Sequence, residues 1–191
     1  MLWDQKLRGE SLRTIVEGML PAQFLLDLGV YMQTAAHIEL VVWQTTMHAE
    51  GIDLHSAEEY RRYVELKFLT KGLLKRYRES ADFCPVPIAD RIRASAHLVE
   101  VGLETRNLAA HGAFFPDDEV PGVIGAAHYF ARGVRKEREL FEVKQAVTQQ
   151  TVEDTLRIAN QLLHEVISIR TAVIGWRFPA GMPEPTRVDS E

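Results

Sequence analysis

The segment IADRIRASAHLVEVGLETRNLAAHG, residues 88–112, carries apolar side chains at the three-to-four spacing of an α-helix. Pro85 and Pro87 lie at its start, and Gly112 is a residue type that commonly follows a helix end. The apolar positions are Ile88, Ile92, Ala96, Val99, Leu103 and Ala110. The spacing therefore predicts one long amphipathic helix that stops at Gly112.

The same periodicity appears on both sides of this segment. We expect, in chain order, a short helix from a Ser11 cap to about Leu20, a long helix from Pro21 to Gly51, a helix from a Ser56–Glu59 capping box through Tyr77, and a last helix from a Thr151 cap to near Gly175. Helices thus account for most of the chain.

The amino-acid composition changes between residue 112 and the last helix. Residues 114–122 are rich in Pro, Asp and Gly and predict a loop, whereas 123–131 and 140–147 favour β-strands joined by a charged turn. The predicted fold class is all-α, a bundle of four to five helices with a β-hairpin inserted before the last helix. We expect a single domain over 1–175 and a flexible tail over 176–191.

Composition narrows the class of protein. A chain of 191 residues can bury a core, and its net charge of −5 argues against a general nucleic-acid coat protein. Cys84 is the only cysteine, so neither an internal disulfide nor a cysteine-based metal site can form. The first residues lack the apolar core of a signal peptide, and the apolar stretches are short and interrupted. We expect a cytoplasmic protein that makes no membrane contact.

Arg106 interrupts the apolar face of the central helix. On an ideal helix it lies about 60° to one side of Leu103, whereas Asn107 and His111 lie about 40° and 80° to the other side. Glu104 comes within about 20° of His111. Burying such groups costs several kcal/mol unless they are paired. They are therefore either paired internally or used in function. At the helix end, the macrodipole favours a protonated His111, and Asn107, one turn earlier, can orient its ring.

Residues 103–112, LETRNLAAHG, resemble the Arg-x4-His signature of the HEPN superfamily in its Arg-Asn-xxx-His form. The resemblance implies a metal-independent endoribonuclease in which two subunits form one composite cleft. Arg106 would then bind the scissile phosphate, His111 would act in acid–base catalysis, and Asn107 would hold phosphate or ring. Glu104 and Glu39 would support them. The resemblance also implies a homodimer, an RNA substrate, an antitoxin or other regulatory protein as partner, and a role as a toxin or antiviral defence effector.

Other interpretations of these residues stay open. Arg106 could pair with Glu104 of a partner chain or with Glu39, and His111 could simply cap the helix. Glu39 could equally lie at a helix edge. The other histidines show no metal-ligand spacing, so neither a metal nor a cofactor is expected. The basic run 132–138 could contact phosphates but is typical of a solvated turn.

Two alternative functions follow from the same residues. The chain could be a catalytically inactive HEPN module that binds nucleotide, RNA or a protein partner. It could also be a helical structural protein in which the motif is coincidental.

Overall fold

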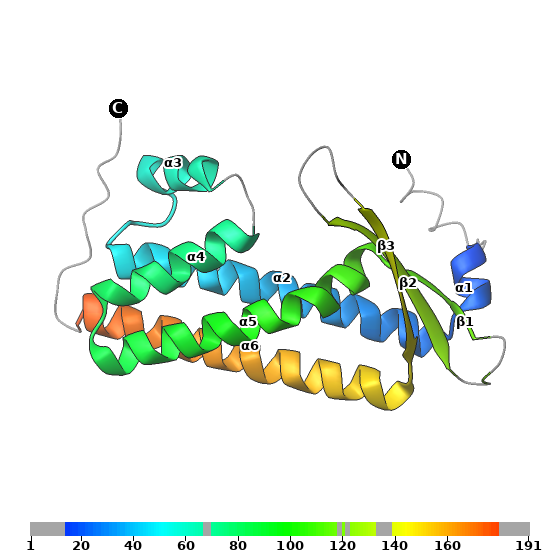
Figure 1. Ribbon diagram of the computed structural model, residues 1–191. Coiled ribbons are helices and arrows are strands. Elements are labelled where there is room, and N and C mark those ends of the chain that lie inside the picture. The colour runs from blue at the N-terminus through cyan, green and yellow to red at the C-terminus, as the bar shows by residue number, and fades with distance from the viewer. Residues whose placement is uncertain (1–13, 67–69, 118–119, 121–122, 133–138, 180–191) are drawn as a thin grey trace, which may run out of the picture. The chain divides into compact units, whose positions relative to one another are not determined.

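The computed structural model describes residues 14–66, 70–117, 120, 123–132 and 139–179, with the backbone alone at 128–132 and 139–144 (Figure 1). The described elements are α1 (Ile15–Met19), α2 (Ala22–Glu50), α3 (Ala57–Glu65), α4 (Thr70–Ser80), the 3₁₀ turn η2 (Ala81–Phe83), α5 (Val86–His111), β1 (Ala113–Pro116), β2 (Ile124–Arg132), β3 (Glu139–Val147) and α6 (Gln149–Arg177). The structure is mostly helical and includes a small antiparallel sheet, which confirms the predicted class at that level. The predicted tail lies mainly outside the described residues.

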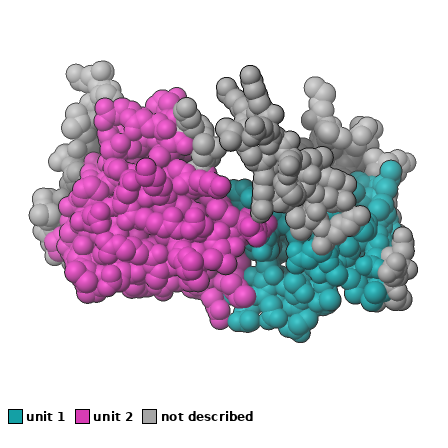
Figure 2. Space-filling model, viewed as in Figure 1, with its two compact units in different colours: residues 1–32, 105–157 teal, residues 33–104, 158–191 magenta. Residues whose placement is uncertain are grey.

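The chain divides into two compact units, which Figure 2 colours separately. Unit 1 comprises residues 1–32 and 105–157, and unit 2 comprises residues 33–104 and 158–191. Each of the long helices α2, α5 and α6 contributes one end to each unit.

Unit 2 contains the larger core. Its fully buried side chains come from α2, α4, α5 and α6, and they include Val42, Leu74, Tyr77, Ile92, Val166 and Ile169. Polar links join α5 to α6 and α2 to α3. The guanidinium of Arg91 donates to both carboxylate oxygens of Glu165, at 2.9 and 3.1 Å. The indole of Trp43 donates to Glu59 at 2.7 Å.

Unit 1 combines α1, the start of α2 and the three-stranded sheet. Leu20, Phe24 and Ile124 form its buried core. The rings of Phe24 and Phe114 pack edge to face, with centroids 5.2 Å apart. In the sheet, of order β1-β2-β3, Phe114 pairs with Ala126, and Ile124 pairs with Val147.

The structure confirms the β2–β3 hairpin but shows that the loop expected over 114–122 was wrong at its start. Ala113–Pro116 forms strand β1, paired antiparallel with β2. Local composition favoured a loop because Pro116 and Asp117 follow closely. The ladder to β2 and the packing of Phe114 are tertiary contacts that composition does not reveal.

Three helix boundaries also differ from the expectation. The side chain of Thr14 caps α1 in a capping box with Glu17, and Ser11 lies outside the described residues. Thr148, rather than Thr151, caps α6, since its Oγ1 accepts from the Thr151 N–H at 3.1 Å. The helix expected from residue 56 through 77 is instead α3 and α4, because the chain turns at Leu66.

Helix α2 is both long and apolar. By length and composition alone it could cross a membrane, although the core helix of a soluble protein passes the same test. Asp27 and Glu39 interrupt its apolar composition but not its helical backbone. The helix also supplies Val42 and Met47 to the fully buried side chains.

Candidate functional site

The last turns of α5 carry Arg106, Asn107 and His111, all in unit 1. His111 is the final residue of the helix, as expected, and the Gly112 N–H donates to the carbonyl of Leu108 at 2.7 Å. A Cβ at residue 112 would lie 2.4 Å from that same oxygen. The close approach of backbone to backbone explains why glycine follows the motif.

The sequence predicted that the apolar face of α5 resumes at Ala110, beyond Arg106, but in the structure it does not. Leu103 packs against the unit 2 core, but Ala110 is exposed. Arg106 and Asn107 are half-buried, and His111 is exposed. The prediction that Ala110 lies on the buried face was therefore wrong, because in this part of α5 the packed side chains lie on another face of the helix.

That other face consists of Thr105, Leu108 and Ala109, which line a cavity in unit 1. On an ideal helix these residues lie between about 120° and 160° from Leu103. The packed face thus changes sides near the end of α5. As a result, the motif side chains lie at or near the surface.

Asn107 and Tyr31 both interact with Arg106. Its Nη1 donates a hydrogen bond to Oδ1 of Asn107 at 3.1 Å. Its positive charge also acts on Tyr31 of α2: burial raises the pKa of the Tyr31 phenol, and the Arg106 charge opposes that rise. The structure therefore joins Arg106 to Asn107 and places Tyr31 within electrostatic range of Arg106. In the sequence, Tyr31 stood out only as part of the helical periodicity of α2.

The two supporting carboxylates lie in unit 2. Glu104 is exposed, and Glu39 is half-buried and accepts a hydrogen bond from the Thr70 hydroxyl at 3.4 Å. The pairing of Glu39 with Arg106 stays a prediction.

The cavity in unit 1 has a volume of about 180 Å³. Most of its wall is apolar, and Asp27 and Tyr31 of α2 contribute polar groups. Asp27 was not singled out from the sequence. The available signal was a carboxylate inside the apolar run Phe24–Leu28, at helical spacing from Tyr31.

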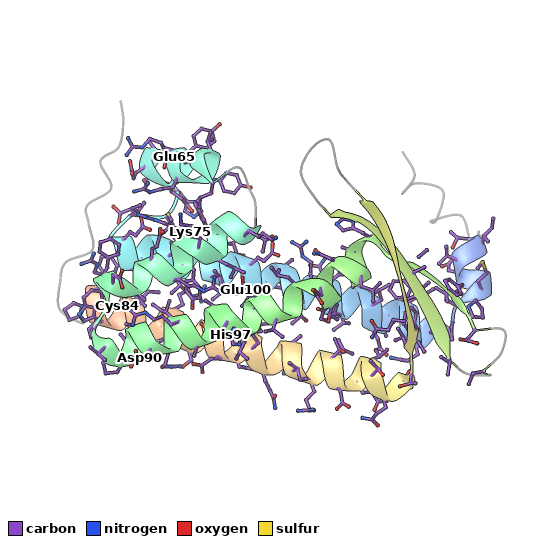
Figure 3. All side chains as sticks on the ribbon, viewed as in Figure 1. Glu65, Lys75, Cys84, Asp90, His97 and Glu100 are labelled. Carbon is purple, nitrogen blue, oxygen red and sulfur yellow. The ribbon has the colours of Figure 1, made fainter. Side chains whose placement is uncertain are left out.

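The structure places the other candidate groups as follows. His97 projects from the middle of α5 and is exposed (Figure 3). Within the described ranges, no group of three or more His, Cys, Asp or Glu side chains could hold a metal ion. The basic run 132–138 falls outside the residues whose side chains are described.

No protein-family model matches the chain, and no curated protein or solved structure is significantly similar to it.

Proposed function

We propose that the protein is a metal-independent endoribonuclease of the HEPN type, whose site contains Arg106, Asn107 and His111. One observation carries the proposal: the three side chains occupy the last two turns of α5, and none of them is fully buried. A phosphodiester can reach such groups, whereas it cannot reach a sealed core.

The chemistry assigned to each group follows from its type. A base removes the proton of the ribose 2′-OH, whose oxygen then forms a bond to the adjacent phosphorus. The bond from phosphorus to the 5′-oxygen breaks, and an acid protonates that leaving oxygen. The products are a 2′,3′-cyclic phosphate and a 5′-hydroxyl. Arg106 stabilises the charge that develops on the phosphoryl oxygens, and Asn107 holds the guanidinium in place.

This reaction needs a base and an acid at once, and each chain supplies a single His111. On an ideal helix Arg106 and His111 also diverge by about 140°. A two-fold dimer resolves both difficulties, because it places two histidines and two arginines around one cleft. We propose a homodimer for this reason. We also propose the cytoplasmic location that the sequence led us to expect. The regulatory partner and the role as toxin or defence effector follow from the resemblance.

The direct test is cleavage of a mixed RNA pool in EDTA by the wild type, Arg106→Ala and His111→Ala. We expect each variant to lose at least about a hundredfold in rate, within the usual range for removal of an acid–base or electrostatic group. Arg93→Ala and His97→Ala are matched controls, because both residues are exposed on the same helix. Equal RNA breakdown by all five proteins would contradict the proposed site.

Two further outcomes separate the alternatives. RNA binding that depends on Arg106 without cleavage would indicate an inactive RNA-binding module. Activity of the wild type that disappears in EDTA would indicate a metal. Light scattering at the assay concentration should give twice the mass of the chain, and a monomeric active protein would contradict the composite cleft.

A further inference from the structure

Asp27 lies buried in the wall of the unit 1 cavity, where a neutral side chain donates a hydrogen bond to it. Its exposed fraction is 8%, and its Oδ1 accepts a hydrogen bond from Nε2 of Gln23, one turn earlier in α2, at 2.8 Å. Within the part of the chain that the structure describes, Asp27 has no ion pair with Lys, Arg or His.

An ionised carboxylate at such a position is energetically unfavourable. Removing it from water costs several kcal/mol, which a close cation can offset. A single hydrogen bond from a neutral amide contributes only about 1 kcal/mol net. The cavity therefore has a strong acceptor that its own described wall does not neutralise.

The rest of the wall is suited to a cationic ligand with an apolar body. The apolar part includes Phe24, Leu28, Leu108, Phe114, Val152 and Leu156. Tyr31, Thr105 and Gln145 add hydroxyl and amide oxygens that can accept further N–H groups. Among the described residues that line the cavity, none is Lys, Arg or His. The described part of the wall thus offers acceptors and apolar surface but no fixed positive charge.

The volume of the cavity suits a small ligand. A dry apolar cavity of about 150 Å³ accommodates a benzene ring, and the present cavity measures about 180 Å³. It has room for one six-membered ring and a short polar arm.

We infer that this cavity binds a small primary amine with an apolar body, whose ammonium group pairs with Asp27. The N–H groups that do not reach Asp27 meet the oxygens of Tyr31 and Gln145, and the apolar body contacts the aromatic and aliphatic wall. The face of α5 that lines the cavity lies about 120° to 160° around the helix from Leu103, whereas Arg106, Asn107 and His111 lie on the Leu103 side. Binding of a small amine can be measured without RNA, so the inference is tested separately from RNA cleavage.

Isothermal calorimetry with the full chain tests the inference, with benzylamine and benzyl alcohol as probes. The two molecules have almost the same shape, but only benzylamine is cationic at neutral pH. We expect the wild type to bind benzylamine at least about tenfold more tightly than benzyl alcohol, since a hydrogen bond to a charged group contributes more than about 1.4 kcal/mol. Asp27→Asn should reduce that ratio to within about twofold.

Two controls locate the effect. Asp154→Asn removes a half-exposed carboxylate of the same unit and should leave the ratio unchanged. Ala109→Leu retains Asp27 but fills part of the cavity, and it should weaken binding of both probes at least about tenfold. If Asp27→Asn does not fold, Ala109→Leu still tests whether the probes bind in this cavity.

Several results would overturn the inference. Equal affinity of the wild type for both probes would show an apolar cavity without cation recognition. No binding of either probe would show that water alone occupies the space. A preference for benzylamine that survives Asp27→Asn, or unchanged affinity of Ala109→Leu for both probes, would place the ligand elsewhere.

Discussion

Arg106 donates a hydrogen bond from Nη1 to Oδ1 of Asn107, its immediate neighbour in α5, at 3.1 Å. Consecutive residues of a helix point about 100° apart, so the long arginine side chain must bend around the helix to reach the short amide. The contact limits where the guanidinium can lie. Of the five N–H donors of Arg106, this one is directed along the helix surface.

Replacing Asn107 tests this restraint. Asn107→Ala should lower the rate of RNA cleavage about tenfold, because Arg106 would lose an orienting hydrogen bond of about 1 kcal/mol. Asn107→Asp should in addition lower the affinity for RNA, since a carboxylate would pair with the guanidinium and compete with phosphate. Fluorescence anisotropy with labelled RNA measures the affinity. An Asn107→Ala protein as active as the wild type would show that the contact has no functional role.

Two glycines, one within α5 and one just after it, should respond in opposite directions to alanine. At Gly112 a Cβ would lie 2.4 Å from the Leu108 carbonyl oxygen, so the backbone must shift. We expect Gly112→Ala to destabilise the fold by about 1–3 kcal/mol. At Gly102 a Cβ meets nothing within 4 Å, and alanine should stabilise the helix by about 0.5–1 kcal/mol. Urea denaturation measures both. The same sign for both substitutions would contradict this account of Gly112.

Glu50 links three helices of unit 2. Its carboxylate, whose side chain is 4% exposed, lies 3.5 Å from Nε of Arg62 and 2.5 Å from Nε of Arg76. Glu50→Gln should cost about 2–3 kcal/mol, because two partly buried cations lose their shared partner. Glu79, which is 45% exposed, pairs with Arg76 at 3.4 Å, and Glu79→Gln should cost under about 0.5 kcal/mol. Equal costs in chemical denaturation would show that Glu50 has no special role.

Tyr77 makes the stability of the fold sensitive to alkaline pH. Burial raises its pKa from 10.0 to about 12, against the opposing effect of its hydrogen bond with Ser95. Between these values the unfolded chain loses the phenol proton while the folded chain keeps it. The contribution of Tyr77 to stability is therefore complete below pH 10 and falls as pH rises toward 12, by roughly 3 kcal/mol in total.

The matched variant for this pH effect is Tyr77→Phe, which has no proton to lose. Its unfolding free energy should be lower at neutral pH by about 1 kcal/mol, the value of the lost hydrogen bond. Between pH 10 and about 12 it should then decline less steeply than that of the wild type. Parallel declines of both proteins would assign the alkaline sensitivity to other groups.

Much of the helical structure could be predicted because helix periodicity and capping are local. The end of α5 at His111, the long helix α2 and the hairpin before α6 all follow from residues close together in the sequence. The candidate motif is equally local, since Arg106, Asn107 and His111 lie within two turns. Its function stays a proposal, because no described contact reports on RNA or on a second subunit.

The errors arose where distant segments meet. Strand β1 forms because Phe114 pairs with Ala126 and packs against Phe24, and no pattern within residues 113–116 predicts those partners. Ala110 continued the apolar spacing but is exposed, because the end of α5 packs through Leu108 and Ala109. A helical face can be calculated from spacing, but the side that becomes buried depends on what packs against it.

The sequence by itself therefore determined the helical class of this protein and the positions of its motif residues, because both depend on neighbours within one or two helical turns. Only the tertiary structure decided which face of α5 is packed, that a third strand joins the hairpin, and that Asp27 is buried beside a cavity. These features depend on burial, which arises from side chains supplied by α2, α5, the sheet and α6 together.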